Sequence, residues 1–432
     1  MNHFEYRGGE LVCEGVPLAA IAEAVGTPVY VYSTATLERH YTVLRDALRG
    51  AGNGEPLIAF AVKANSNLSV LKTLFDLGAG ADTVSEGEIR RALAAGAPPE
   101  RIVFSGVGKA AHELAFAVET GVAEINVESE PELDLLSKIA ADKGALGAAR
   151  QAIAIRINPD VAAGGHAKIA TGQADAKFGV SMSEAERLYA KASNMPGVRP
   201  VGVACHIGSQ ITDLAPMKAA FAKMRALVER LRAEGLTVER LDLGGGLGAP
   251  YFSQPDPPSP EAYAAMVAEA VRGLDVQLAF EPGRVIAANA GVLLSRVIHV
   301  HERDAKHEGG RRFLVLDAAM NDLMRPAMYD AFHHIRPVRE PDASAEPVLY
   351  DVVGPVCETG DTFARDRALP PLKAGNLVAF LSAGAYGAVM ASEYNTRPLV
   401  PEVMVKGDKW SVVRPRPTYE EMLAREPLAE WL

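Results

Sequence analysis

The sequence predicts an α/β fold in two parts, a (β/α)8 barrel of the TIM type and a mostly antiparallel β domain that forms a sandwich or barrel. Three observations predict it. Eight short β-like runs recur between residues 57 and 283. Alanine-rich segments of helical pattern separate these runs. After residue 284, β-rich runs follow one another with few long amphipathic helices between them, which indicates a separate antiparallel unit.

The eight runs are almost continuously apolar, as expected of strands that are buried on both faces of a parallel sheet. Their span suits a (β/α)8 barrel, which typically takes about 250 residues. A doubly wound open sheet is the alternative. The runs are "LIAFAVK" (57–63), "GADTVS" (80–85), "RIVFSG" (101–106), "AEINVES" (123–129), "AIAIRIN" (152–158), "GVACHIG" (202–208), "RLDLGGG" (240–246) and "QLAFEPG" (277–283).

The change of pattern after residue 284 sets the expected domain boundaries. Residues 36–284 are expected to form the barrel, and residues 285–432 the β domain, with runs such as "GVLLSRVIHVH" and "NLVAFLS". From its pattern alone, the N-terminal run "TPVYVYS" (27–33) fits either unit. The family resemblance described below places residues 1–35 with the β domain.

Composition limits the partners of the chain. Its 432 residues are 48% hydrophobic and 23% charged, with a formal net charge of -10, which argues against nucleic acid or an anionic membrane as a partner. The three cysteines are far apart and show no CxxC spacing, so a reducing compartment is expected. The polar start "MNHFEYRGGE" does not resemble a signal peptide, and no apolar stretch is long enough to span a bilayer. A cytoplasmic protein is therefore expected.

The predicted strand ends carry the groups that can perform chemistry. Catalytic residues of βα barrels gather at the C-terminal ends of the strands. Lys63 ends the first run, His206 lies in the sixth, and Gly244, Gly245 and Gly246 end the seventh. "EPGR", with Glu281 and Arg284, ends the eighth. Each has a simpler interpretation: a strand tip that reaches solvent, a core histidine, a tight turn or a surface ion pair.

Together these groups meet the requirements of pyridoxal 5′-phosphate (PLP). The lysine amine condenses with the cofactor aldehyde to a Schiff base, and the glycines point backbone N–H groups at its phosphate. A carboxylate favours a protonated ring nitrogen, and an imidazole stacks on the ring. The glycines are followed by "LGAPYFSQPDPP", which breaks helices, so a dinucleotide-binding motif is rejected. No metal site is expected, because the ten histidines are scattered without carboxylates at ligand spacing.

Motifs along nearly the whole chain resemble the diaminopimelate decarboxylases, which belong to the alanine-racemase-like, fold-type III PLP-dependent decarboxylases. They occur in the family's order: "AVKAN", "TVSEGEI", "RINPD", "CHIGSQ", "LDLGGGLG", "EPGR", "DAAMNDLMRPAMY", "GPVCETGD" and "GAYGAVMASEYN". The resemblance implies a lyase that decarboxylates meso-2,6-diaminopimelate to L-lysine, the last step of bacterial lysine biosynthesis.

The resemblance also implies a role for each matching residue. Lys63, His206 and Cys357 would be catalytic, with Lys63 as the Schiff base and Cys357 as the proton donor. The cofactor would be held by Lys63, His206, Ser209, Gly244, Gly245, Gly246, Glu281, Gly283, Arg284 and Tyr386. The substrate would be bound by Arg284, Arg325, Tyr329, Glu358 and Tyr386. Relatives are homodimers in which the equivalents of Cys357 and Glu358 reach the active site of the partner, so shared sites are expected.

Charge favours diaminopimelate over smaller substrates. Its distal end carries both a carboxylate and an ammonium, and Arg325 with Glu358 offers the complementary pair. The alternatives are a related decarboxylase of ornithine, arginine or carboxynorspermidine, and a non-catalytic PLP-carrying protein. The segment 158–179 departs from the family pattern by its "AAGG", and it is expected to be a polar loop near the barrel mouth that acts as a lid.

Overall fold

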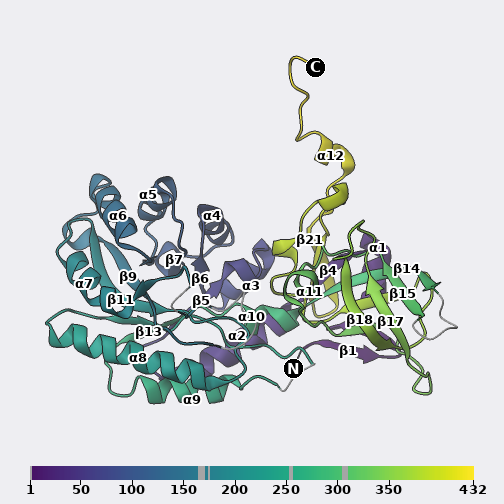
Figure 1. Ribbon diagram of the computed structural model, residues 1–432, viewed down its shortest axis with the longest axis horizontal. Coiled ribbons are helices and arrows are strands. Elements are labelled where there is room, and N and C mark those ends of the chain that lie inside the picture. The colour runs from purple at the N-terminus through teal and green to yellow at the C-terminus, as the bar shows by residue number, and fades with distance from the viewer. Residues whose placement is uncertain (1, 164–170, 174–175, 253–255, 304–309) are drawn as a thin grey trace. The chain divides into compact units, whose positions relative to one another are not determined.

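The computed structural model describes residues 2–163, 171–173, 176–252, 256–303 and 310–432 (Figure 1). The chain divides into two compact units. The barrel unit comprises residues 38–250 and 255–286, and the β unit comprises residues 1–37, 251–254 and 287–432. The functional boundaries at residues 36 and 284 stay a prediction. Two parts of the predicted lid, residues 164–170 and 174–175, lie outside the described residues.

Eight parallel strands close the barrel unit, which confirms the predicted fold class (Figure 1). Neighbouring strands pair in the order β9-β11-β12-β13-β5-β6-β7-β8, and a pairing of β8 with β9 completes the circle. Each strand lies within or overlaps one of the eight predicted runs. They are β5 (Leu57–Ala61), β6 (Gly80–Thr83), β7 (Ile102–Phe104), β8 (Glu124–Val127), β9 (Gln151–Asn158), β11 (Val198–Cys205), β12 (Arg240–Asp242) and β13 (Gln277–Phe280).

Helices connect the strands, and their first residues show why they begin where they do. Ser85, Ser129 and Ser181 each accept a hydrogen bond from a backbone N–H three residues later, the usual N-cap arrangement. These connections bring all the C-terminal strand ends to one rim of the barrel. The helices are α2 (Thr34–Leu48), α3 (Leu68–Asp76), α4 (Glu86–Ala94), α5 (Ala111–Thr120), α6 (Glu130–Asp142), α7 (Met182–Ser193), α8 (Leu214–Ala233), α9 (Pro260–Ala270) and α10 (Arg284–Ala287); a short strand β10 (Val180–Ser181) extends the sheet beside β9.

A mostly antiparallel sheet forms the second unit, as predicted. Its main path is β18-β17-β15-β14-β4-β20-β21, and the pairs β4–β20 and β15–β17 are parallel. The run 27–33 supplies β4 (Val29–Ser33), which pairs with β14 and so belongs to this unit. The other strands are β14 (Gly291–Arg303), β15 (Arg311–Leu316), β16 (Ile335–Pro337), β17 (Val348–Val353), β18 (Thr362–Leu369), β19 (Leu377–Phe380), β20 (Glu402–Lys406) and β21 (Lys409–Arg414), with helices α11 (Arg325–Tyr329) and α12 (Tyr419–Leu423).

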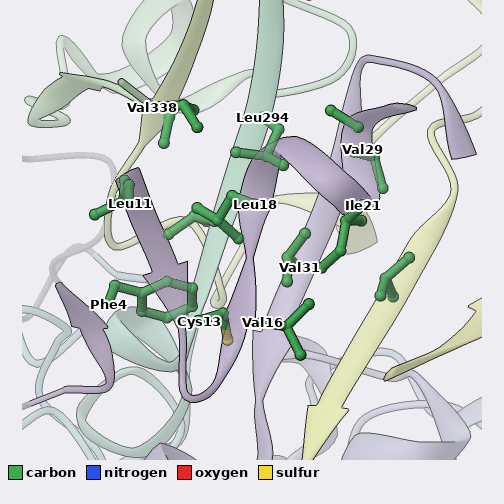
Figure 2. Close-up of a cluster of buried hydrophobic side chains, with 14 of the residues drawn as sticks. Phe4, Leu11, Cys13, Val16, Leu18, Ile21, Val29, Val31, Leu294 and Val338 are labelled. Atoms are coloured by element: carbon green, nitrogen blue, oxygen red, sulfur yellow. The ribbon is translucent and has the colours of Figure 1, made fainter. Parts of the chain in front are cut away.

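The N-terminus adds a small sheet that the sequence did not predict. β1 (Phe4–Arg7), β2 (Glu10–Cys13) and β3 (Val16–Pro17) form three antiparallel strands, and α1 (Leu18–Val25) follows. Figure 2 shows their apolar side chains packed on those of β4 and β14. Leu11, Leu18 and Ile21 are fully buried there, and each such burial stabilises the unit by about 1.5–3 kcal/mol.

Candidate active site

Lys63 lies directly beyond the first barrel strand. β5 ends at Ala61, and a short 3-10 turn (Val62–Ala64) carries the lysine. Its Nζ donates to Oδ2 of Asp82 at 2.7 Å. Asp82 is fully buried on β6, whereas the Lys63 side chain is 37% exposed. The structure therefore holds a primary amine at the rim of the barrel against a buried carboxylate.

His206 follows β11 and is held in one protonation state. Its Nδ1 accepts a hydrogen bond from the backbone N–H of Gly245 at 3.1 Å, so the proton of the neutral ring lies on Nε2. Burial is the main cause that holds the pKa of His206 well below its usual value, and Arg156 and Lys63 lower it further. A neutral, flat imidazole therefore lies beside the glycine turn, and such a ring can stack on an aromatic cofactor.

The glycines after β12 form a turn that other residues do not fit. An added Cβ would lie 2.3 Å from the Cys205 carbonyl oxygen at Gly244 and 2.2 Å from the Glu281 carbonyl oxygen at Gly245. Gly244 (φ +64°) and Gly246 (φ +110°) also have left-handed backbones, which glycine adopts most readily. Backbone can thus come close to a ligand here, which is the requirement for a phosphate-binding turn.

Ser209 and Arg284 lie together near this turn. The Nε of Arg284 donates to Oγ of Ser209 at 3.1 Å, and Arg284 is 6% exposed. Arg284 begins α10, directly after Gly283 and the end of β13. One hydroxyl and one guanidinium are therefore available for an anion at the same rim.

Glu281 is held by two side chains that the sequence analysis did not identify. Its Oε1 accepts from Ser105 Oγ and from Asn126 Nδ2, both at 3.2 Å. Asn126 also donates to Ser105 at 3.0 Å. Ser105 directly follows β7 and Asn126 lies on β8, more than 150 positions from Glu281, so no local pattern could reveal the contact.

Three buried carboxylates face one another inside this rim. Burial, and then the charges of Asp242 and Asp82, raise the pKa of Glu281 well above its usual value. Burial is also the main cause that raises the pKa of Asp242 to about 6. Oδ1 of Asp82 is buried and has no hydrogen-bond partner among the described residues. A cation bound beside Glu281 would lower the free energy of this cluster.

In the β unit, Arg325 is buried and oriented by two aromatic residues. Its Nη1 donates to Tyr251 Oη and to His333 Nε2, both at 3.0 Å. His333 Nδ1 lies 2.9 Å from the Leu381 carbonyl oxygen and donates to it, so Nε2 is the acceptor. The sequence analysis did not identify this role of His333, because the residue lies eight positions from Arg325 in an irregular segment.

The remaining predicted residues also lie in the β unit. Cys357 and Glu358 are exposed on the loop between β17 and β18. Tyr329 ends α11, and Tyr386 has a left-handed backbone (φ +55°). Cys13 and Cys205 are buried, and burial raises the pKa of both thiols, so Cys357 is the one exposed cysteine of the three. Within the described ranges, no group of three or more histidine, cysteine, aspartate or glutamate residues could hold a metal ion.

Comparison with known proteins identifies the family. The model of the family described as "Pyridoxal-dependent decarboxylase, pyridoxal binding domain" matches residues 34–288. The chain is 50% identical, over 433 residues, to a diaminopimelate decarboxylase of Zymomonas mobilis, and the alignment covers 100% of both proteins. The chain belongs to the diaminopimelate decarboxylase family.

Solved structures of this family share the fold. A diaminopimelate decarboxylase from M. jannaschii matches with a TM-score of 0.92 at 34% identity, covering 100% of this chain and 99% of that one. The Helicobacter pylori enzyme complexed with L-lysine matches with a TM-score of 0.87 at 39% identity, covering 94% and 98%. The family is pyridoxal-dependent, and the barrel residues fit that cofactor: the glycine turn excludes a Cβ, His206 is neutral, and buried carboxylates surround Glu281.

Proposed function

We propose that this chain decarboxylates meso-2,6-diaminopimelate to L-lysine with pyridoxal phosphate as cofactor. One observation carries the proposal: an amine, a neutral imidazole, a glycine turn and a buried carboxylate lie at the ends of four strands of one barrel. The relatives that match over full length are named diaminopimelate decarboxylases, which supports the substrate.

The cofactor would be held at four points. Lys63 would bind its aldehyde carbon, and His206 would pack on its ring. The N–H groups of Gly244–Gly246, the Ser209 hydroxyl and the Gly283–Arg284 backbone would bind the phosphate. Glu281 would accept a hydrogen bond from the protonated ring nitrogen, and Tyr386 would contact cofactor and substrate. When bound, pyridoxal phosphate supplies an aldehyde for the substrate amine and a ring that accepts the electron pair left by the departing carboxylate.

Asp82 stabilises the protonated form of the Lys63 amine. A charge-assisted hydrogen bond of 2.7 Å stabilises the protonated amine, and the neighbouring carboxylates of the cluster add to this preference. The lysine can therefore bring a proton to the rim or remove one without leaving the barrel. Ser105 and Asn126 both donate to Oε1 of Glu281 and so orient the carboxylate that would face the ring nitrogen.

The β unit would recognise the distal end of the substrate. Arg325 and Tyr329 would bind the distal carboxylate, and Glu358 the distal ammonium, while Arg284 would bind a carboxylate from the barrel side. The orientation of Arg325 by Tyr251 and His333 supports this role, because a fixed guanidinium fork selects a planar carboxylate. Cys357 would then give the proton of its Sγ to the carbon that has lost carbon dioxide.

A homodimer completes the proposal. Cys357 and Glu358 are exposed in the β unit, and Cys357 of the partner subunit would serve each active site. Dilution that separates the subunits should then abolish activity. A cytoplasmic location is also part of the proposal; the described helices include none that is long and apolar enough to cross a membrane.

The test is a comparison of substrates. The purified protein is incubated with pyridoxal phosphate and, separately, with meso-diaminopimelate, L-ornithine and L-arginine. Released carbon dioxide is measured and the amine product is identified. We expect L-lysine from diaminopimelate and at least a hundredfold lower rate with the other two, roughly the effect of losing the charge-assisted hydrogen bonds between a distal carboxylate and Arg325, about 3 kcal/mol. Faster turnover of ornithine would refute the assignment.

A further inference from the structure

The loop that carries Cys357 and Glu358 has a rigid backbone. The buried carboxylate of Asp361 accepts the N–H of Val356 and the N–H of Met320, both at 2.7 Å. Further backbone hydrogen bonds run from Glu358 to Val356 and from Asp361 to Glu358. These contacts fix the main chain of the loop, but they do not fix the two side chains at its tip, which are exposed.

Two consecutive residues of another segment contact those side chains. Oδ1 of Asn395 lies 3.4 Å from the backbone nitrogen of Cys357 and 3.5 Å from its Sγ, and it accepts from both. Tyr394 Oη donates to Oε2 of Glu358 at 3.2 Å. That hydrogen bond and the charge of Glu358 raise the pKa of Tyr394. Each member of the Cys357–Glu358 pair thus has its own partner.

The segment that supplies these partners has a strained backbone. Asn395 (φ +57°) and Thr396 (φ +55°) are both left-handed, a conformation that is costly for a β-branched residue such as threonine. Strain of this kind persists only where surrounding contacts impose it, and it is concentrated at functional sites. Here Asn321 exchanges two hydrogen bonds with Ser392 on one side, and Arg397 donates to the Asp317 carbonyl oxygen on the other.

The same region leads directly into the helix that carries Arg325. Residues 317–321 hold the ends of the strained segment, and Met320 donates to Asp361 of the Cys357 loop. α11, with Arg325 at its start, follows four residues later. The Cys357 loop, α11 and the segment that contains Tyr394 and Asn395 are therefore tied to one stretch of chain within the β unit.

We propose that Tyr394 and Asn395 are positioning residues for the Cys357–Glu358 pair. Asn395 holds the sulfur of Cys357 in one rotamer, and Tyr394 holds the carboxylate of Glu358. The inference rests on the proposed function, in which Cys357 delivers a proton and Glu358 binds the distal ammonium. The two neighbours therefore affect different kinetic parameters: Asn395 affects kcat, and Tyr394 affects KM.

The main variants are chosen so that the backbone stays as it is. Asn395→Gly removes the carboxamide but tolerates the left-handed conformation, and Tyr394→Phe removes one hydroxyl. A cysteine free to visit three staggered rotamers loses about threefold in correctly placed sulfur. A sulfur that is displaced from its proper position also transfers its proton more slowly. The two losses together should lower kcat for diaminopimelate about tenfold in Asn395→Gly and leave KM within about twofold. Tyr394→Phe should raise KM about fivefold and leave kcat within about twofold.

Double variants separate positioning from a general structural role. The effect of Asn395→Gly should vanish in a Cys357→Ala background but remain in a Glu358→Gln background. The effect of Tyr394→Phe should vanish in the Glu358→Gln background but remain in the Cys357→Ala background. The same penalty in both backgrounds would overturn the proposal. Thr396→Gly is the matched control, because it frees the backbone one residue further on without touching Cys357 or Glu358, and it should retain wild-type kinetics.

Thiol alkylation tests the contact without any catalysis. Since Cys13 and Cys205 are buried, iodoacetamide should modify Cys357 first, and mass spectrometry can follow the rate. Release from Asn395 should raise that rate about threefold in Asn395→Gly, whereas Tyr394→Phe and Thr396→Gly should match the wild type. An unchanged rate in Asn395→Gly would refute the positioning claim. If the variants show this alkylation pattern but the wild type does not decarboxylate diaminopimelate, the proposed function is refuted instead.

Discussion

Replacement of Gly245 by alanine tests whether the glycine turn has room for a side chain. Its backbone is not left-handed, so alanine suits its conformation, but the new Cβ would lie 2.2 Å from the Glu281 carbonyl oxygen and 3.1 Å from the Glu281 carbonyl carbon. Both atoms belong to the backbone and cannot rotate away. The turn after β12 must therefore move from the end of β13 by about 1 Å, a displacement large enough to disturb a preorganised site. His206, which accepts from the Gly245 N–H, moves with it.

The size of the effect follows from these distances. Over-packing lowers the free energy of unfolding by about 1–3 kcal/mol. Because the new Cβ of Gly245→Ala meets backbone atoms, we expect a loss of about 3 kcal/mol. For a unit of this size each kcal/mol lowers Tm by about 2–4 °C, so we expect a fall of about 6–12 °C. Loss of one or two charged hydrogen bonds to the phosphate, about 1.5–3 kcal/mol each, would raise the Kd for pyridoxal phosphate about a hundredfold.

Thermal unfolding with and without the cofactor measures both effects. At a concentration of 100 times the wild-type Kd, the cofactor stabilises the wild type by about 2.7 kcal/mol but the variant by only about 0.4 kcal/mol. Gly108→Ala is the matched control, since its added Cβ meets no atom within 4 Å. If Gly245→Ala kept the wild-type Tm and bound the cofactor with a Kd within about threefold of wild type, the assignment of this turn to the phosphate would be wrong.

Three further predictions concern charge. Lys63→Ala should remain folded but lose both the yellow absorbance of the protein with pyridoxal phosphate and its decarboxylase activity; retention of either contradicts the role of the amine. Arg325→Ala should lower kcat/KM for diaminopimelate by at least about a hundredfold and leave ornithine turnover unchanged, and equal losses for both substrates would exclude selective recognition. Burial raises the pKa of Glu124 to about 7 despite its ion pair with Arg240, so the folded state retains a proton that the unfolded state releases above about pH 4.5. The free energy of unfolding of the wild type relative to Glu124→Gln should therefore be constant below about pH 4.5 and fall by about 3 kcal/mol as pH rises through 7. Denaturant titrations at pH 4 and pH 8 measure it, and a difference between the two proteins that is equal at both pH values or larger at pH 8 would contradict the prediction.

The barrel was predictable because its strands are buried on both faces. Runs such as "LIAFA" and "AIAIRIN" are apolar at almost every position, and their number and spacing fit a barrel with eight repeats, although a doubly wound open sheet remained the alternative. The N-terminal sheet was not predictable in this way. β1 to β3 are two to four residues long, and each buries only part of itself, so their pattern does not differ from that of a loop.

The residues alone predicted the candidate site only where it follows a strand, and the predicted residues of the β unit came from the family resemblance. Lys63, His206 and Glu281 could be placed because the end of a barrel strand fixes the location of a side chain. Ser105, which follows β7, and Asn126, which lies on β8, hold Glu281, and no periodicity links them to it. Asn395 reaches Cys357 across 38 positions through a left-handed turn, a contact that only the folded chain reveals.

The buried carboxylates explain why the barrel favours a cationic ligand. Asp82, Asp242 and Glu281 raise one another's free energy when ionised, and the ammonium of Lys63 compensates only part of this charge. A second cation beside Glu281 would allow its carboxylate to ionise at neutral pH, so binding of a protonated ring should be coupled to proton release from the cluster. The affinity for pyridoxal phosphate should accordingly fall as pH drops below the value of about 6 at which Asp242 takes up its proton. Replacing Asp242 by asparagine should flatten that dependence, and an affinity that is constant from pH 5 to pH 8 in the wild type would show that the cluster does not serve the ring nitrogen.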